Sequence, residues 1–270
     1  MPKNKSEILL EGYLRSRGMT DFEFEPVLTG TSRRPDYRLS TGRGDLLLEV
    51  KEFAASPIDI KSGFGVFDPY PPLREKINAA SRKFKDLSEH ACCLVLYNLN
   101  RPFILLDWKH IYGAMLGNLG FSLPIRIERE SSPIPENQIR QVFTFGGKMH
   151  RESKGAVVAP QNRTISAIIV LGRVAAGRRL LHAHLKRQEA LLGRRFDFEE
   201  LAAELKAHKG TGSDPRHRPL RVTVHENPYA RMPVPRDLFR GPYDERYGES
   251  DGRIQQLFVG EQLVGLPSET

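Results

Sequence analysis

Residues 35–53, PDYRLSTGRGDLLLEVKEF, decide the fold of this 270-residue chain. The arms 36–40 and 45–53 are strand-like, and the segment 41–44 between them contains two glycines. Two strand-like runs joined by a short glycine-rich segment are typical of a β-hairpin. The sequence therefore predicts a hairpin here.

The second arm of this hairpin has two different faces. Side chains alternate along a strand, so Leu46, Leu48 and Val50 are expected on one face, with Glu49 and Lys51 on the other. An acid and a base within a nearly apolar strand are costly to bury unless they are paired or bind a metal. The hairpin therefore has the pattern of a functional site.

Asp36 and Glu49 are expected to meet where the two arms pair. Two carboxylates suit a hard cation such as Mg²⁺, which prefers oxygen ligands. Lys51 beside a metal-bound water can orient or deprotonate it, which is the chemistry of phosphodiester hydrolysis. The spacing alone is not specific, because Glu204-Leu205-Lys206 repeats it in a segment that is typical of a solvated helix face.

The flanking sequence gives the hairpin its context. Apolar periodicity predicts helices over 6–17 and 73–87, a short strand over 22–25 and a buried strand over 91–97. The expected order is helix, strand, strand, strand, helix, strand.

With this order and with Asp36, Glu49 and Lys51 in place, the first hundred residues resemble the PD-(D/E)XK nuclease superfamily, also called restriction-endonuclease-like. The resemblance implies an α/β fold with a mixed central β-sheet flanked by helices. It also implies a nuclease that cleaves DNA with Mg²⁺ or Mn²⁺. Asp36 and Glu49 would then bind the metal together with the carbonyl of Val50, and Lys51 would activate or position the attacking water.

Many members of this family add a metal-binding glutamate from the first helix. Glu7, eleven residues before Gly18, is the predicted residue, and Glu11 one turn later is the alternative. Either can instead be a surface glutamate that the dipole of the helix N-terminus favours.

The helix expected over 73–87 is basic on one side. Lys76 and Lys83 are seven residues apart and share a face, and the resemblance implies that this helix packs beside the site, where a polar residue on it can contact a phosphate. We predict them as nucleic-acid contacts. The alternative is a solvated face above an apolar core.

Charge also favours a polyanionic partner. The chain has a formal net charge of +8, and the stretch 146–224 contains sixteen Lys and Arg against seven Asp and Glu. Such a basic segment next to a carboxylate site is expected of an enzyme that acts on nucleic acid, and DNA is the predicted partner. A basic surface that maintains solubility is the alternative on charge alone.

The predicted organisation is a nuclease-like core over 1–175 with an insertion around 112–154, followed by a basic, helical and loop-rich extension over 176–270 packed on the core. Further expected elements are strands over 103–107, 165–171 (central) and 221–225, and helices over 175–193 and 196–208. The segment 227–247 is expected to wrap the surface.

Composition excludes several other classes. No apolar run reaches membrane-spanning length, and the N-terminus lacks the apolar region of a signal peptide. The adjacent Cys92 and Cys93 are expected to be buried on opposite faces of a strand, which fits a reducing cytoplasm. No phosphate-binding loop, zinc-type cysteine spacing or nucleophile elbow is present.

Two functional alternatives stay open. The chain can be a DNA-binding or interaction protein that keeps the fold without cleaving, although the three signature residues are intact. It can also cleave RNA, since the same metal chemistry attacks either phosphodiester. A homodimer or a partner protein is compatible with the resemblance, and no coiled-coil segment marks one.

Overall fold

The computed structural model of the chain describes residues 3–28, 33–53, 68–98, 104–122, 140–144, 147–153, 156–174, 200 and 218–261. Its elements are, in chain order, α1 (Lys5–Ser16), β1 (Phe22–Phe24), β2 (Tyr37–Thr41), β3 (Gly44–Phe53), α2 (Tyr70–Phe84), β4 (Ala91–Asn98), α3 (Trp108–Leu116), β5 (Asn118–Ser122), β6 (Arg140–Thr144), β7 (His150–Ser153), β8 (Ala156–Pro160), β9 (Ile165–Arg173), β10 (Leu220–Glu226), β11 (Glu245–Ser250) and β12 (Arg253–Val259).

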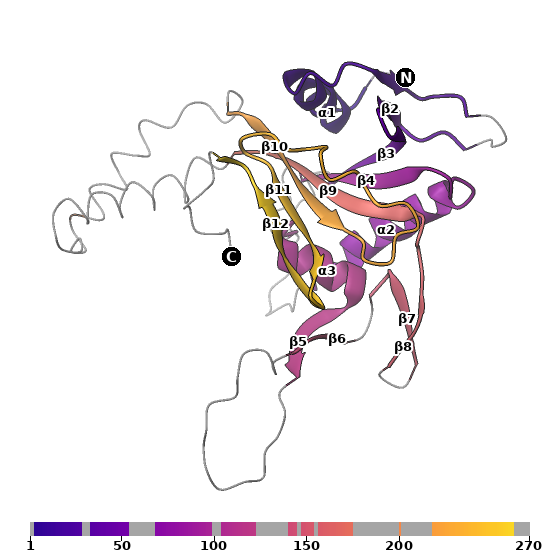
Figure 1. Cartoon of the computed structure of the whole chain (residues 1–270), viewed down its shortest axis with the longest axis vertical. Helices are drawn as coiled ribbons and strands as arrows, with labels where there is room; N and C mark the ends of the chain where they lie inside the picture. The colour runs from indigo at the N-terminus through magenta and orange to yellow at the C-terminus, as the bar shows by residue number, and fades with distance from the viewer. Residues whose placement is uncertain are drawn as a thin grey trace, which may run out of the picture.

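The centre of the molecule is an eight-stranded sheet in the order β1-β2-β3-β4-β9-β10-β11-β12 (Figure 1). The pairs β3–β4, β4–β9 and β10–β11 are parallel, and the other four are antiparallel. The sheet is therefore mixed. This confirms the predicted α/β class with a mixed central sheet and flanking helices.

The first half of the chain follows the predicted order of elements. Asn4 caps α1, because its side chain accepts a hydrogen bond from the backbone N–H of Glu7. Gly44 closes the β2–β3 hairpin with a φ of 112°, a conformation that side chains other than glycine rarely adopt. The helix predicted from residue 73 begins earlier, at Tyr70, because prolines are tolerated in a first helical turn, where their missing N–H groups are not needed.

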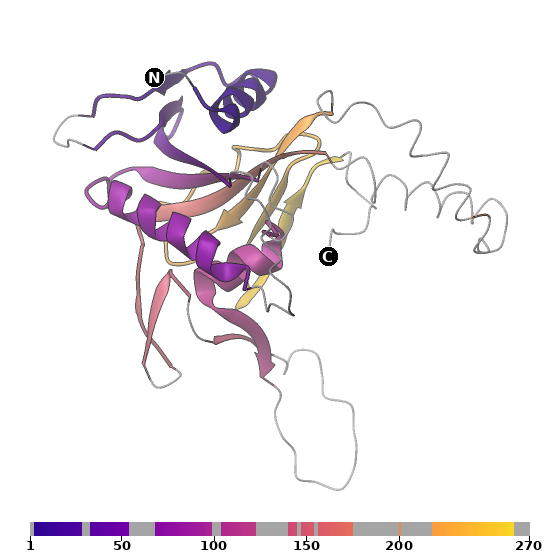
Figure 2. The same cartoon turned by 180° about the vertical axis from the view of Figure 1, so that it is seen from behind.

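The expected alternation along β3 is confirmed, and it separates two apolar layers. Leu46, Leu48 and Val50 pack in the layer that contains Leu10 and Leu14 of α1. The opposite layer is covered by α2 and α3, which lie along one face of the sheet in Figure 2. Its members from the sheet and α2 include Leu47, Phe53, Leu73, Ile77, Ala80 and Phe84.

The two cysteines follow the same division. Both are buried and free, with Cys92 in the layer of α2 and Cys93 in the layer of α1. Their predicted placement on opposite faces of a strand is confirmed.

The predicted strand over 103–107 is wrong in its described part, because residues 104–107 form no strand. Asp107 instead caps α3, and its Oδ1 accepts a 3.1 Å hydrogen bond from the backbone N–H of His110. This side chain pairs with a backbone N–H that has no partner within the helix. The cap therefore favours a helix start at this point over continuation of the apolar run as a strand.

The second half of the chain contributes more to the sheet than expected. The strand predicted over 165–171 is confirmed as β9, which lies between β4 and β10. The segment 227–247, expected to wrap the surface, ends in β11, and β12 follows as the edge strand. The boundary at residue 175 therefore does not separate two sheets, because strands from both sides of it pair in one.

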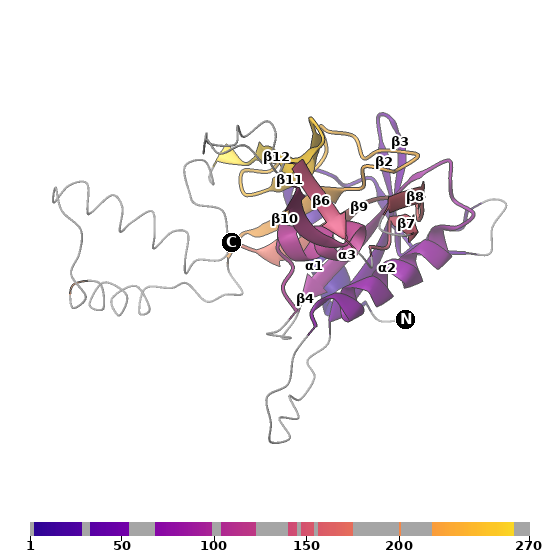
Figure 3. The ribbon, with the colours of Figure 1, turned by 90° about the horizontal axis from the view of Figure 1, so that it is seen from below.

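Two small strand pairs, β5–β6 and β7–β8, extend from one end of the central sheet and lie toward the viewer in Figure 3. Strands β5, β6 and β7 fall in the region predicted as an insertion around 112–154, and β8 begins directly after it, at Ala156. The helices predicted over 175–193 and 196–208 lie outside the described residues, except for residue 200. None of the helices in the described ranges is long and apolar enough to cross a membrane.

Candidate active site

Asp36 stands directly before β2 and opposite the middle of β3. The strands pair Tyr37 with Leu48, so the next position on each strand juxtaposes Asp36 and Glu49. The backbone N–H of Val50 donates a 2.7 Å hydrogen bond to Asp36 Oδ2. The hairpin register and this bond hold the Asp36 carboxylate beside Glu49, as the sequence predicts.

Glu49 is the buried member of the group, with 1% of its surface exposed. Its Oε1 lies 2.7 Å from the Lys51 ammonium, on the same face of β3. Burial and the nearby Asp36 carboxylate raise the pKa of Glu49, although the hydrogen bonds from Lys51 and Lys83 oppose this effect. The strand therefore holds a carboxylate that needs cationic partners to stay ionised.

Lys83 of α2 supplies the second of these partners. Its ammonium lies 2.9 Å from Asp36 Oδ1 and also forms an ion pair with Glu49 Oε2. Burial disfavours the charged ammonium, but the hydrogen bonds with Glu49 and Asp36 outweigh this and raise the pKa of Lys83. The four side chains of Asp36, Glu49, Lys51 and Lys83 form one cluster, which we call the carboxylate–lysine cluster.

The bridge made by Lys83 is absent from the sequence-based prediction, which placed this lysine among nucleic-acid contacts. A signal was present in the helix itself. Lys83 comes directly before Phe84 and one turn after Ala80, and both of these are buried in the layer below α2. A lysine at that edge of the apolar face is directed toward the sheet, where a carboxylate is its natural partner.

The cluster has features that suit a divalent cation. Glu49 Oε2 is buried, and the only positive charge that it faces among the described residues is the Lys83 ammonium. Two carboxylate oxygens converging on a positive charge provide the donor set that Mg²⁺ or Mn²⁺ prefers. The oxygens of Asp36 and Glu49 are therefore of a kind that fits a divalent cation, and the carbonyl of Val50 stays a predicted third ligand.

Water would have to complete such a coordination shell. Over the described residues, no three His, Cys, Asp or Glu side chains are gathered closely enough to hold a metal ion. Mg²⁺ commonly keeps several waters and takes one or two carboxylates from the protein.

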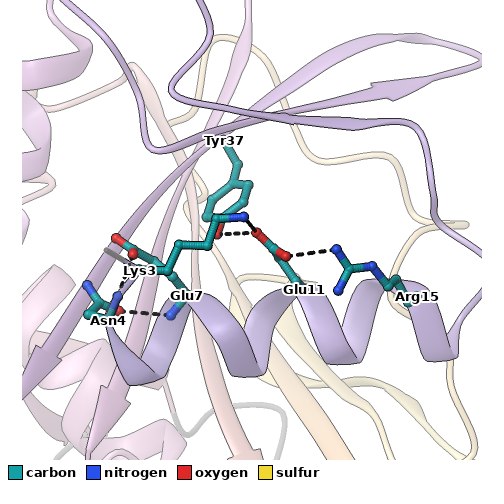
Figure 4. Close-up of polar contacts among 6 residues, drawn as sticks. All are labelled: Lys3, Asn4, Glu7, Glu11, Arg15 and Tyr37. Carbon is teal, nitrogen blue, oxygen red and sulfur yellow. Dashed lines mark hydrogen bonds and ion pairs between the residues drawn. The ribbon is translucent and has the colours of Figure 1, made fainter. Parts of the chain in front are cut away.

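The two candidate glutamates of α1 have different partners (Figure 4). Glu7 closes a capping box, because its Oε2 accepts a 2.8 Å hydrogen bond from the backbone N–H of Asn4. The capping interaction alone does not require a metal. The role of Glu7 as a ligand stays a prediction.

Glu11 is buried, and both of its oxygens are engaged. Oε1 accepts a 2.9 Å hydrogen bond from Tyr37 Oη and forms an ion pair with Lys3, and Oε2 lies 2.9 Å from Arg15. Burial alone would raise the pKa of Glu11, but the hydrogen bonds from Lys3 and Tyr37 outweigh it and lower that pKa. Glu11 thus links α1 to β2, and its oxygens are less available than those of Glu7.

Lys76 lies on the same face of α2 as Lys83, nearer the end of β3. Its ammonium is 5.8 Å from the centroid of the Phe53 ring. This contact places a positive charge beyond Lys51 along the strand, and Arg34 is exposed two residues before Asp36. Lys76 therefore places a basic side chain near the end of β3, on the face of the strand that contains Glu49 and Lys51.

Comparisons with known proteins do not assign the chain to a family. No protein-family model matches it, and neither a curated protein nor a solved structure does.

Proposed function

We propose that this protein is a metal-dependent nuclease of the PD-(D/E)XK type that hydrolyses DNA phosphodiester bonds. The observation that carries the proposal is the gathering of Asp36, Glu49 and Lys51 in one cluster, in which Lys51 pairs with Glu49 and Lys83 links Glu49 to Asp36. Adjacent strands supply the first three of these residues, within the element order that the resemblance implies. Two carboxylates and a lysine at one place are the parts that this hydrolysis uses.

Each residue has a separate task in this proposal. Asp36 and Glu49 hold a divalent cation with the carbonyl of Val50, and the Val50 N–H fixes the orientation of the Asp36 carboxylate. When bound, the metal lowers the pKa of a water and neutralises charge that develops on the phosphate. The Lys51 ammonium, paired with Glu49 Oε1, would donate hydrogen bonds that orient the attacking water and stabilise the charge that develops on the phosphate.

Nucleic acid is the substrate class that the charge distribution supports. Lys76 places positive charge near the end of β3, where a phosphate beside the scissile bond can contact it, and the exposed Arg34 lies two residues before Asp36 in the sequence. The sixteen Lys and Arg of the stretch 146–224 supply the wider basic region, most of which lies outside the described residues. Phosphate contacts of this kind predict binding that weakens as salt increases.

Cleavage of a mixed substrate pool tests the proposal. Linear, circular, single-stranded and branched DNA, with an RNA of matched sequence, are incubated with Mg²⁺, Mn²⁺ or EDTA. The proteins compared are the wild type, Asp36→Asn, Lys51→Met and Asp45→Asn. Asp45→Asn is the matched control, because this carboxylate belongs to the same hairpin and pairs with Arg38 at the far end of it.

We expect metal-dependent cutting that falls about 100-fold or more in Asp36→Asn and Lys51→Met and persists in Asp45→Asn. Equal cutting by all four proteins would contradict the proposal. Cutting of RNA alone would change the substrate class. Salt-sensitive binding without any cutting would favour a protein that keeps the site but does not cleave.

A further inference from the structure

The four carboxylate oxygens of the carboxylate–lysine cluster are all engaged by the protein itself. Asp36 Oδ2 accepts the Val50 N–H, and Glu49 Oε1 faces Lys51. Asp36 Oδ1 and Glu49 Oε2 both face the ammonium of Lys83. A bound metal would have to join these last two oxygens, which belong to different segments of the chain. In this structure the Lys83 ammonium joins them.

We propose that Lys83 is an internal counter-cation, whose ammonium occupies the cation position between Asp36 and Glu49 until a divalent cation displaces it. The identity of that cation rests on the proposed function. An ammonium is a compact charge with three donors, and it meets two carboxylate oxygens as a metal ion does. The two cannot occupy the same position at once.

Displacement of Lys83 by a divalent cation changes the net charge of the cluster. Two carboxylates and two ammonium groups balance, so the metal-free cluster carries no net formal charge. A bound divalent cation adds two positive charges and leaves Lys83 without its acceptors. The metal-bound site then attracts an anionic phosphodiester more strongly. By thermodynamic reciprocity, nucleic acid raises the affinity for the metal by the same factor.

Lys83 has the freedom that this exchange needs. Its side chain is 28% exposed, and its charge is carried on a four-carbon stem from a helix, whereas Glu49 is buried within β3. The ammonium can therefore swing away from the carboxylates while α2 and the sheet keep their places. Asp36 and Glu49 stay where the hairpin register holds them.

Metal binding without nucleic acid is the first measurement. Mn²⁺ is titrated calorimetrically into the wild type, Lys83→Met, Lys76→Met and Asp36→Asn, each checked for folding by circular dichroism. We expect Lys83→Met to bind Mn²⁺ about tenfold tighter, since both a competitor and a positive charge are removed. Lys76→Met is the control for loss of positive charge alone, because the Lys76 ammonium lies over the Phe53 ring. The Mn²⁺ affinity of this variant is expected to differ from that of the wild type by less than about threefold.

A second measurement uses the unaltered protein. Its lysines are acylated with and without Mg²⁺, and the modified residues are quantified by mass spectrometry, with Lys76 as internal reference. Displacement predicts that acylation of Lys83 rises severalfold with Mg²⁺ while that of Lys76 stays constant.

The outcomes separate this inference from the proposed function. Wild-type binding that Asp36→Asn abolishes, with Lys83→Met no tighter and acylation of Lys83 unchanged, would overturn the counter-cation and leave the metal site standing. Mn²⁺ binding that is absent from every protein, or equal in Asp36→Asn and the wild type, would overturn both.

Discussion

The Tyr13 hydroxyl of α1 donates a 2.6 Å hydrogen bond to Asp244 Oδ2, across 231 residues of sequence. Asp244 is fully buried, and it also accepts the backbone N–H groups of Val222 and Gly241 at 3.0 and 2.5 Å. Burial and the Asp244 carboxylate raise the pKa of Tyr13 well above its ordinary value, so its hydroxyl stays a donor. This carboxylate joins the first helix to β10 and to the segment before β11.

Removing the Asp244 charge is therefore expected to destabilise the whole fold. Asp244→Asn leaves one of three buried donors facing an amide group, and we expect a loss of about 2–4 kcal/mol in the free energy of unfolding. Tyr13→Phe removes a single hydrogen bond and should cost about 1–2 kcal/mol. Urea unfolding of both variants measures this, with the exposed Asp251→Asn as control. Equal stability of Asp244→Asn and the control would contradict the assignment.

His225 predicts a loss of stability in acid. Its ring stacks on Tyr247 with centroids 5.6 Å apart and meets the edge of Tyr112, and neither nitrogen has a hydrogen-bond partner among the described residues. Burial lowers the pKa of His225 from 6.5 to about 3, and the Asp107 carboxylate opposes this only weakly. Between these two values the unfolded chain binds a proton at His225 and the folded protein does not. The free energy of unfolding is therefore at its full value above pH 6.5 and decreases as the pH falls toward 3.

The size of this effect is bounded by the two pKa values, at about 5 kcal/mol. His225→Phe keeps the stacked ring without the titrating nitrogens, so its unfolding free energy should fall less steeply with acid than that of the wild type. Urea unfolding from pH 7 to pH 4 tests this, with the half-buried His90→Gln as control. Parallel pH profiles for His225→Phe and the wild type would reject this explanation.

Glu11 predicts a second acid-sensitive contribution, at lower pH. Its pKa lies below the ordinary 4.5, so its stabilising ion pairs are complete above that value and are lost as the pH falls through the folded-state pKa. Glu11→Gln should destabilise by about 1–3 kcal/mol at pH 7 and lessen the decline below pH 4.5. Glu23→Gln is the matched control, because its ion pair with Arg38 is exposed and should contribute less than about 1 kcal/mol.

Glu7 and Glu11 can be distinguished as metal ligands by their glutamine variants. Glu7→Gln keeps an oxygen that accepts the Asn4 N–H, so we expect stability within about 1 kcal/mol of the wild type. If the prediction for Glu7 holds, its Mn²⁺ affinity falls about tenfold through loss of a nearby negative charge, whereas Glu11→Gln leaves that affinity nearly unchanged. Titration calorimetry measures both. Wild-type affinity in Glu7→Gln would remove Glu7 from the ligand set.

Several features of this protein could be predicted from its sequence because they depend on local order. The hairpin of β2 and β3 follows from two strand-like arms around glycines, and the division of Leu48 from Glu49 follows from the alternation of a strand. Hairpin pairing also brings Asp36 opposite Glu49, since the register of a hairpin is set by its turn. These inferences need only neighbours in the chain.

The same local signals were insufficient where a cap or a distant partner decides the structure. The apolar run at 103–107 resembled a strand, but Asp107 caps α3, and a single hydrogen bond at a helix start overrides a short apolar pattern. Strands β11 and β12 join the sheet although their sequences alternate poorly, because β10 offers a free edge to pair with.

The order of residues along the chain was enough to predict two carboxylates and a lysine on one hairpin, and the family resemblance added the mixed α/β architecture. Which cations face those carboxylates depends on tertiary packing. Lys83 is 47 residues from Asp36, and it reaches the cluster because α2 packs on the face of the sheet that contains Glu49. Contacts of this kind depend on how whole elements pack. Periodicity along the chain specifies which face of a helix is apolar, but it does not specify which charged residue of the sheet lies beneath the edge of that face.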